Sequence, residues 1–366
     1  MKAICGFIRH EAVLSIAFAC ALISAFFVHP DASYIEYIDF RVLGILFCLM
    51  AVVALLQECG AFKALARALL SGEKSIKFVF ATLVLLPFFS SMLITNDVAL
   101  ISFVPFAVLV LSAMERQDAL IRIVVLQTVA ANLGSMATPV GNPQNLFLFA
   151  KYELGAGEFF GLILPFAAIS LVLLLPALCN ARGKEQVTLP EEKCDRTALI
   201  VCVVLFALCL MSVFRLLDWK ILTAVVAVVI YFTDKRMFRR VDWALLMTFI
   251  CFFVFSGNLG RIPAINHALE AMMDKNALLA SAAASQIISN VPAAVLLQPM
   301  TDNWQELLLG VDIGGLGTPV ASLASLISLK LYMAVPGAKV GKYMLYFTAM
   351  NLLGLVLLLP LAALVV

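Results

Sequence analysis

The chain has 366 residues, of which 63% are apolar and only 13% are charged. Soluble globular domains average about 45–50% apolar and about 25% charged residues, so this composition, with a mean hydropathy of +1.05, argues strongly against a soluble protein. The formal net charge of +2 is too small to indicate a nucleic-acid partner. The nine cysteines stand singly and no pair has metal-ligand spacing, so we expect no cofactor and no metal beyond a coupling cation.

Seven stretches are apolar and long enough to cross a hydrocarbon core of about 30 Å. In chain order they are 11–28, 38–57, 158–179, 197–214, 217–233, 242–259 and 342–364. Two longer apolar regions, 119–150 and 304–333, are interrupted in the middle by glycine and proline, which predicts two broken transmembrane helices. Two mixed stretches, 60–71 and 262–275, are expected to lie along the membrane surface.

Two further apolar regions, 76–113 and 277–301, carry polar residues at their centres, in the sequences LITNDVAL and IISNVPAAV. Each arm of the second region has about 12 residues, which a helix extends over about 18 Å, too short to cross. We therefore predict a re-entrant hairpin at 277–301. The arms of 76–113 are longer, so this region either forms a second re-entrant hairpin or crosses twice; both possibilities return the chain to the same face.

The basic residues are distributed unequally between the two faces of this arrangement. Nine crossings and two hairpins place 19 of the 25 Lys and Arg residues on one face and 6 on the other. The positive-inside rule makes the more basic face cytoplasmic. The N-terminus is therefore predicted inside and the C-terminus outside, with the first hairpin entering from the cytoplasm and the second from outside.

The two broken regions resemble each other. The segment 131–147, ANLGSMATPVGNPQNLF, matches the segment 311–327, VDIGGLGTPVASLASLI, because each holds a Thr-Pro-Val sequence with a glycine four residues before the threonine. Asn132 then aligns with Asp312. The hairpin tips match as well, since each has a hydroxyl residue followed by asparagine: Thr95-Asn96 and Ser289-Asn290.

These matches divide the chain into a first repeat at 1–180, a cytoplasmic linker at 181–196 and a second repeat at 197–366. Between the equivalent starts at positions 11 and 217 the chain crosses five times, and an odd number of crossings inverts the second copy. The predicted fold class is an all-α polytopic membrane protein, an inverted repeat with two re-entrant hairpins and two broken transmembrane helices. Secondary transporters that work by alternating access have this architecture.

The tips and breaks expose helix ends at membrane depth. Residues suited to start a helix occur in four places: Thr95-Asn96-Asp97, Asn142-Pro143, Ser289-Asn290 and Thr318-Pro319. Free N–H groups at helix N-termini favour an anion, whereas free carbonyls with Asn, Ser and Thr oxygens suit Na⁺. No Lys or Arg is predicted at this depth, so we expect an anion to bind well only after a cation has supplied charge and ordered the loops.

Four motifs resemble those of the ion-transporter superfamily: TNDVAL, GSMATPVGNPQN, SQIISNVP and VDWALL. This superfamily includes citrate symporters, arsenite permeases, NhaD-type antiporters and divalent anion:sodium symporters. The most similar branch is that of the YbiR-type permeases, which implies a multi-pass protein of the bacterial inner (plasma) membrane. In the divalent anion:sodium symporters each hairpin tip carries Ser-Asn-Thr, which binds substrate carboxylate and, with the facing broken-helix loop, forms a Na⁺ site.

Carried over by motif, the resemblance implies two overlapping sets of binding residues. The substrate-binding set is Thr95, Asn96, Thr138, Ser289, Asn290 and Thr318. The cation-binding set is Thr95, Asn96, Asp97, Gly134, Thr138, Gly141, Asn142, Ser289, Asn290, Gly314, Thr318 and Ser322. This chain departs from the pattern at the third tip position, where Asp97 and Val291 stand in place of threonine. An Asn-Asp pair is closer to the arsenite-permease and citrate-symporter branches.

The two acidic residues of these regions have more than one interpretation. An intramembrane carboxylate is costly and usually functional, so Asp97 is a cation ligand or a protonatable coupling group; alternatively, it caps a helix at 98–113. Asp312, about nine residues beyond Trp304, is expected to face an external vestibule, to cap a helix or to be solvated. Other polar residues in apolar surroundings are expected mainly to form interhelical hydrogen bonds: Asn132, Gln144, Asn145, Asn258 and Gln286.

The sequence thus predicts a transporter and not an enzyme, namely a cation-coupled secondary transporter of a small anion such as a di- or tricarboxylate or an inorganic oxyanion. Na⁺ is favoured over H⁺ because two similar tip-and-loop sites suit two cations. An arsenite-type efflux permease and a sodium/proton antiporter are alternatives on the same fold, whereas a channel or an intramembrane enzyme would be a different class. The expected partners are the small anionic substrate, the lipid bilayer and, by family likeness, a second copy in a homodimer.

Overall fold

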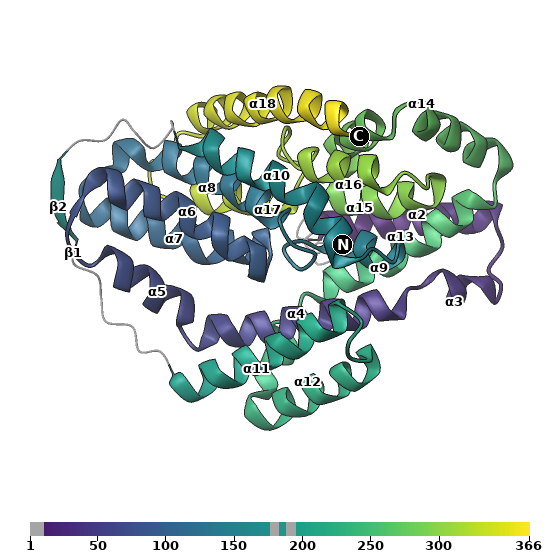
Figure 1. The fold of residues 1–366 in the computed structure, drawn as a ribbon, viewed down its shortest axis with the longest axis horizontal. Coiled ribbons are helices and arrows are strands. Elements are labelled where there is room, and N and C mark those ends of the chain that lie inside the picture. Colours follow the sequence, from purple (N-terminus) through teal and green to yellow (C-terminus); the bar gives the residue numbers. More distant parts are fainter. Residues whose placement is uncertain (1–10, 176–182, 188–194) are drawn as a thin grey trace, which may run out of the picture.

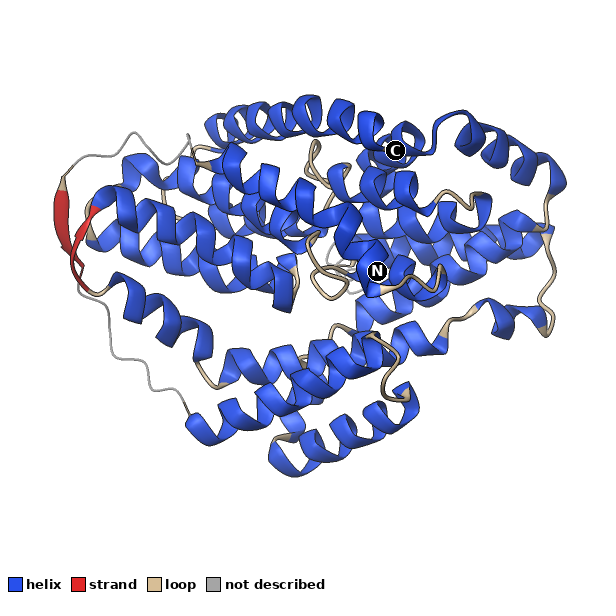
Figure 2. Ribbon diagram, viewed as in Figure 1, coloured by secondary structure: helices blue, strands red, loops and turns tan. Residues whose placement is uncertain are grey.

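The structure, a computed structural model, describes residues 11–175, 183–187 and 195–366. This part of the chain is built almost entirely of helices, with one short pair of strands at one end (Figures 1 and 2). The predicted cytoplasmic N-terminus and most of the predicted linker at 181–196 lie outside the described residues.

Seven helices within the described residues are long and apolar enough to cross a membrane. They are α4 (Phe40–Glu58), α6 (Ile76–Ile94), α7 (Asn96–Ala113), α10 (Ala156–Leu174), α11 (Arg196–Val213), α13 (Trp243–Gly260) and α18 (Val340–Val365). Shorter apolar helices are α2 (Ala12–Phe27), α12 (Trp219–Thr233) and α17 (Leu323–Met333). Large apolar side chains such as Phe26 and Phe232 are exposed, as expected where a helix faces lipid. The predicted all-α polytopic membrane class is confirmed.

The remaining helices are shorter or more polar. They are α3 (Ser33–Tyr37), α5 (Ala61–Leu70), α8 (Leu120–Ser135), α9 (Pro143–Lys151), α14 (Pro263–Ile288), α15 (Asn290–Leu297) and α16 (Trp304–Ile313), with 3₁₀ turns η1 (Gln117–Ala119), η3 (Lys235–Arg239) and η4 (Gln298–Met300). The predicted surface stretch 60–71 corresponds to α5. The predicted surface stretch 262–275 and the first hairpin arm are joined in α14 across Asn276, whose backbone is extended and whose side chain caps the second part by accepting from Leu279 N.

Both regions predicted as broken helices consist of two helices. The first is divided into α8 and α9 by residues 136–142, and the second into α16 and α17 by residues 314–322. Figure 2 shows loops in the middle of the helical bundle, far from its two ends. In the second hairpin α15 has 8 residues, about 12 Å of helix, which is too short to cross a membrane. In the first hairpin α6 and α7 are each long enough to cross, so the two possibilities for 76–113 stay open.

The packing of these helices has a crossed pattern. The first arm of each hairpin packs against the first helix of its own broken region, α6 on α8 and α14 on α16. The second arm packs against the second helix of the other region, α7 on α17 and α15 on α9. Around this centre α2 packs on α13, and α4 packs on α11 and α12, the group at the bottom of Figure 1. The chain halves are therefore interleaved and not two separate bodies.

A short antiparallel strand pair joins two distant parts of the chain at one end of the bundle. β1 (Gly72–Ser75) pairs with β2 (Lys184–Val187), with Gly72 opposite Val187. Part of the predicted linker is therefore ordered against the segment that leads into α6. The sequence has no alternation strong enough to predict these strands, since each has four residues.

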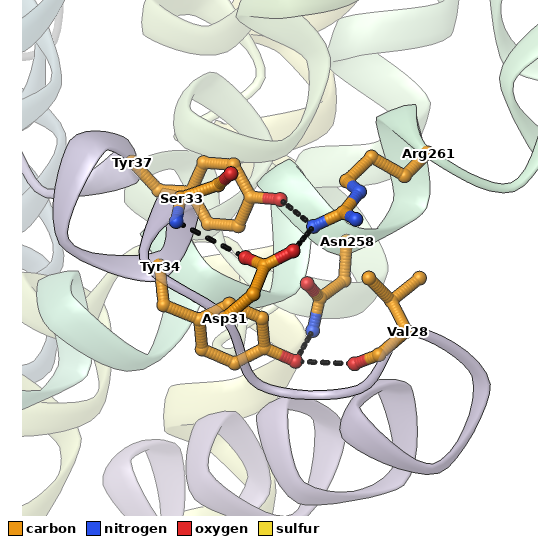
Figure 3. Close-up of polar contacts among 7 residues, drawn as sticks. All are labelled: Val28, Asp31, Ser33, Tyr34, Tyr37, Asn258 and Arg261. Atoms are coloured by element: carbon orange, nitrogen blue, oxygen red, sulfur yellow. Dashed lines mark hydrogen bonds and ion pairs between the residues drawn. The ribbon is translucent and has the colours of Figure 1, made fainter.

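A polar cluster joins α2, α3 and α13 at the opposite end of the bundle (Figure 3). Arg261 donates hydrogen bonds to Asp31 Oδ2 (2.8 Å) and to Tyr37 Oη (3.2 Å). Asn258 Nδ2 donates to Tyr34 Oη (2.8 Å), which bonds in turn to a main-chain carbonyl before α3. Asn258 thus forms the predicted interhelical hydrogen bonds. The hydrogen bond from Arg261 lowers the pKa of the Asp31 carboxyl group below its usual value.

Replacing Arg261 with glutamine is expected to lower the melting temperature of the detergent-solubilised protein at pH 7, because the pair with Asp31 is lost. Asp31 has a lowered pKa when folded, so it stabilises the folded state above about pH 3.9, the unfolded value, and loses this contribution as pH falls through its folded pKa. The wild-type melting temperature should therefore fall more steeply with acid than that of Arg261→Gln. Lys151→Gln is the control, and parallel curves for all three proteins would contradict the assignment.

Candidate functional site

The two hairpin tips have the same backbone conformation. Thr95, between α6 and α7, has φ 66° and ψ 149°, and Ser289, between α14 and α15, has φ 73° and ψ 155°. A positive φ is strained for a residue other than glycine, most of all for a β-branched threonine, at a cost of about 1–3 kcal/mol. Such strain persists only where the surrounding structure holds it, and it is concentrated at functional sites.

An asparagine follows each strained residue as the first residue of the helix, and its side chain accepts a hydrogen bond from the next main-chain N–H. Asn96 Oδ1 accepts from Asp97 N (3.0 Å), and Asn290 Oδ1 accepts from Val291 N (2.9 Å). Both asparagine residues are 5% exposed. Because α7 begins at Asn96, Asp97 lies inside the first turn of this helix, and its interpretation as the N-cap of 98–113 is wrong. Its carboxylate is favoured there by the helix dipole.

Two glycines allow each broken region to approach its hairpin closely. A Cβ atom on Gly134 would lie 2.1 Å from the carbonyl oxygen of Phe88 on α6. A Cβ atom on Gly314 would lie 2.8 Å from the Cα of Ala282 on α14. A Cβ atom on Gly141 would lie 2.1 Å from the Ser135 carbonyl oxygen, within the loop of the first broken region itself. Gly134 and Gly314 therefore set how closely the broken regions approach the hairpins, whereas Gly141 allows the first loop to fold back on the end of α8.

Replacing Gly134 with alanine is expected to destabilise the protein by about 1–3 kcal/mol, because the new methyl group meets backbone atoms that cannot move aside. Gly161→Ala on α10 is the matched control, since nothing lies within 4 Å of its added methyl group and alanine favours the helix. Melting temperatures in detergent measure both. Equal melting temperatures for the two variants would refute the close approach.

The two threonines of the Thr-Pro-Val sequences hold the loops against the hairpins. Thr138 Oγ1 donates to the main-chain carbonyl of Met92, and Thr318 Oγ1 donates to that of Gln286 (3.0 Å). Met92 and Gln286 each stand three residues before the strained tip residue. Gln286 Nε2 also donates to the carbonyls of Gly314 (2.7 Å) and Leu316. These are the interhelical hydrogen bonds predicted for Gln286, and they connect the second hairpin to the second broken region.

The helix starts of the two broken regions differ. Asn142 caps α9 by accepting from Asn145 N (2.8 Å), with Pro143 as the first helical residue, as predicted. In the second region α17 begins at Leu323, so Thr318-Pro319 does not start this helix and that prediction is wrong. The second region lacks an Asn-Pro pair at the corresponding position, which leaves Ser322 as the residue before the helix.

Asn132 is the centre of one hydrogen-bond network between the two halves of the chain. Its Oδ1 accepts from Asn96 Nδ2 (3.0 Å) and from Ser322 Oγ (3.1 Å). Its Nδ2 donates to Ser325 Oγ (3.2 Å). Asn132 thus forms the predicted interhelical hydrogen bonds, and it links the first tip to the second broken region.

Asp312, aligned with Asn132, is the centre of the corresponding network. Its Oδ1 accepts from Asn142 Nδ2 and from Gln144 Nε2, both at 3.2 Å. The residue is 4% exposed. The expectations that Asp312 faces an external vestibule or is solvated are therefore wrong, because α16 packs this residue inward against α9. Sequence reasoning gave Gln144 no place in the site, although its position beside the Asn-Pro pair was a signal.

A narrow cavity of about 10 Å³ lies where both tips meet the broken regions. Its polar lining residues are Asn96, Asp97, Gln144, Asn290 and Ser322. This volume holds about one water molecule or one small ion. Among the described residues, no group of three or more His, Cys, Asp or Glu side chains is placed to hold a metal ion. An ion here would therefore be coordinated by amide, hydroxyl and single carboxylate oxygens.

A larger cavity of about 620 Å³ adjoins the narrow one at Asp97. Thr95, Asp97 and Asn142 line the end that adjoins the narrow cavity, here called the deep end, and apolar residues of α4, α7 and α17 line its walls. Its lining also includes four charged residues, Glu11, Arg240, Asp242 and Lys330, of which the last three are exposed. The volume is sufficient for a small polycarboxylate or oxyanion.

The predicted site residues therefore fall into two groups. Those that line one or both cavities are Thr95, Asn96, Asp97, Asn142, Asn290 and Ser322. Those that line neither are Gly134, Thr138, Gly141, Ser289, Gly314 and Thr318. The second group instead makes hydrogen bonds to main-chain carbonyls or close contacts within and between the tips and the broken regions.

Comparisons with known proteins show the family of this chain. Residues 3–324 match the family model described as citrate transporter. An uncharacterized transporter of Methanocaldococcus jannaschii is 34% identical over 311 residues, which cover 84% of this chain and 85% of that protein. The inner membrane protein YbiR of Escherichia coli is 29% identical over 319 residues, 84% of each chain. A silicon efflux transporter of Oryza sativa is 34% identical over 138 residues, 38% of this chain and 28% of the rice protein.

The family match spans both hairpin tips and the first broken region, and it ends at the second residue of α17. The matched part thus contains every residue that lines the narrow cavity. The relatives are membrane proteins or transporters by name, in agreement with the seven apolar helices. The chain is a multi-pass membrane transporter that belongs to the citrate transporter family.

Proposed function

We propose that this protein is a cation-coupled secondary transporter of a small anion, with Na⁺ as the coupling ion. One observation carries the proposal: two tips with the same strained turn, each followed by a buried asparagine, meet two interrupted helices around a pair of adjoining cavities. Interrupted helices at membrane depth are tolerated where they line a cavity, and transporters use them to bind ions and substrate.

The anion would bind at the deep end of the larger cavity, at Thr95 and Asn142. The N-termini of α7 and α9 begin there, and each carries about half a positive charge. No Lys or Arg lines this deep end among the described residues, whereas Asp97 does. A cation in the narrow cavity would neutralise Asp97 and order both tips, so that the anion binds tightly only after it.

The transporter would be oriented with the larger cavity open to the cytoplasm. Arg240 and Lys330, which line this cavity, belong to the face that the positive-inside rule makes cytoplasmic. In this orientation the N-terminus is inside, the C-terminus is outside, and the membrane is a bacterial inner membrane. The two halves would form an inverted repeat. The hairpins with their broken helices would move against the outer helices, which gives alternating access. The functional unit would be a homodimer.

A second candidate is a permease that exports a neutral oxyacid such as arsenite. The observation that favours it is the similarity to a protein named as a silicon efflux transporter. A sodium/proton antiporter is a third use of the same tips, in which Asp97 would carry the exchanged ion and no anion would bind.

Uptake into proteoliposomes tests the proposal. The purified protein is reconstituted and given carboxylates, sulfate, phosphate or arsenite, each with and without an imposed Na⁺ or pH gradient. The proposal expects one anion to accumulate only with an inward Na⁺ gradient. Accumulation that is independent of both gradients would refute coupling, and cation exchange without any anion would favour the antiporter.

A further inference from the structure

We infer that Asp312 is a ligand of a monovalent cation in the second half of the chain, where it supplies the charge that Asp97 supplies in the first half. This inference rests on the proposed function, and it adds a binding residue that neither the hairpin motifs nor the tip residues indicate.

The two halves each carry one carboxylate near the tips, at positions that do not correspond. The residue aligned with Asp312 is Asn132, and the residue aligned with Asp97 is Val291. The first half therefore has its charge on the hairpin, and the second half has its charge on the broken helix. Two carboxylates match two monovalent cations, so that the site becomes neutral when both are bound.

The Asp312 carboxylate has no compensating charge within the described residues. Its hydrogen-bond donors are the neutral amides of Asn142 and Gln144, and it forms no ion pair there. With the residue 4% exposed, water cannot replace a counter-charge. A buried carboxylate without a charged partner is strongly unfavourable, which indicates that a positive ion belongs beside it.

Two buried oxygen atoms in this cluster also lack hydrogen-bond donors. They are Asp312 Oδ2 and Asn145 Oδ1, and Asn145 is fully buried on α9. Asn145 directly follows Gln144, which donates to Asp312, on α9. Buried acceptors without a donor suit a hard cation, which coordinates carboxylate and amide oxygens together.

One of the two amides that hold Asp312 can supply a further ligand. Gln144 presents nitrogen to the carboxylate, and a half-turn of its amide group presents oxygen in the same place, whereas the Asn142 amide is held by its cap bond to Asn145 N. Gln144 also lines the narrow cavity beside Asn290, so a cation at Asp312 would be linked to the second tip. The cation would thereby join α16 of one half to α9 of the other.

Asp312→Asn tests the inference when its melting temperature is followed against NaCl concentration, with choline chloride holding ionic strength constant. Asp302→Asn, an exposed change in the same half, is the matched control. Asp312→Asn keeps the shape of the side chain and removes its charge. We expect it to be at least as stable as the wild type without Na⁺, and to need about tenfold more Na⁺ or greater for the same stabilisation. Asp302→Asn should follow the wild type.

The outcomes separate this inference from the proposed function. If Na⁺ stabilises the wild type and Asp312→Asn equally, the inference is overturned while the coupling proposal stands. If no monovalent cation stabilises the wild type and uptake needs no gradient, the proposed function itself fails. If only acid stabilises the wild type, and this effect is absent in Asp312→Asn, the group holds a proton and the inference is overturned. Asp312→Glu, which keeps the charge, should retain Na⁺ stabilisation at reduced affinity even where Asp312→Asn folds poorly.

Discussion

Alanine in place of either tip asparagine is expected to reduce coupled uptake by about 5- to 150-fold. Asn96 is buried, accepts from Asp97 N and donates to Asn132, and Asn290 is buried and accepts from Val291 N. Removing a buried hydrogen-bonding group costs about 1–3 kcal/mol, which corresponds to this range of equilibrium constants. The loss falls on the state in which both tips are ordered, since these hydrogen bonds lie directly beside the strained turns.

Initial rates of Na⁺-driven uptake in proteoliposomes measure this effect, normalised to the amount of folded protein. Asn266→Ala is the control, because Asn266 lies on the surface stretch of α14 and bonds to Glu270 on the same helix. Size-exclusion profiles show whether each variant folds. Uptake near the wild-type rate in a folded Asn96→Ala or Asn290→Ala protein would exclude a role for that tip.

Asparagine in place of Asp97 is expected to remove Na⁺ dependence, with the Na⁺ concentration for half-maximal uptake raised by about 10- to 100-fold. Asp97 is the one acidic residue that lines both cavities among the described residues, and it lies in the first turn of α7. Asparagine keeps its size and removes its charge. The bound cation then loses its nearest negative partner, and the driving force no longer couples to the anion.

Anion binding by the same variant distinguishes the alternatives. In the symporter, Asp97→Asn binds the anion with an affinity that Na⁺ no longer changes, because the repulsive charge and the cation site are removed together. In the antiporter, the variant exchanges no ions and neither protein binds an anion. Asp118→Asn, an exposed change between α7 and α8, is the control. Unchanged Na⁺ dependence in Asp97→Asn would exclude this residue as a cation ligand.

Binding of the cation and binding of the anion would be coupled because the two cavities share lining residues. The narrow cavity is lined by residues of both tips and both broken regions, and Asp97 is common to both cavities. A cation there would change the charge and the order of the surface on which the anion binds. A ligand shifts the equilibrium between two conformations only as far as its affinities for them differ. The hydrogen-bond networks at Asn132 and Asp312 join the two halves of the chain, so a change in them would alter the affinity for the cation.

The sequence by itself determined the membrane class, the positions of the helices and the two interruptions. Each of these depends on local properties, namely the length of apolar stretches and the glycine, proline and capping residues that end a helix. The start of α9 at Asn142-Pro143 is an example, since cap and proline are adjacent in the chain. The predicted start at Thr318 failed because the same local signal was weaker there, and α17 begins at Leu323 instead.

The tertiary structure alone decided which polar groups meet. Asn132 and Ser322 are 190 residues apart, and Asn142 and Asp312 are 170 apart. The motifs paired each tip with the broken region of its own half. In the folded chain the second arm of each hairpin also packs against the broken region of the other half, α7 on α17 and α15 on α9. Such contacts depend on how helices pack in three dimensions, and a hydropathy pattern carries no information about partners that distant. The burial of Asp312 follows from that packing alone.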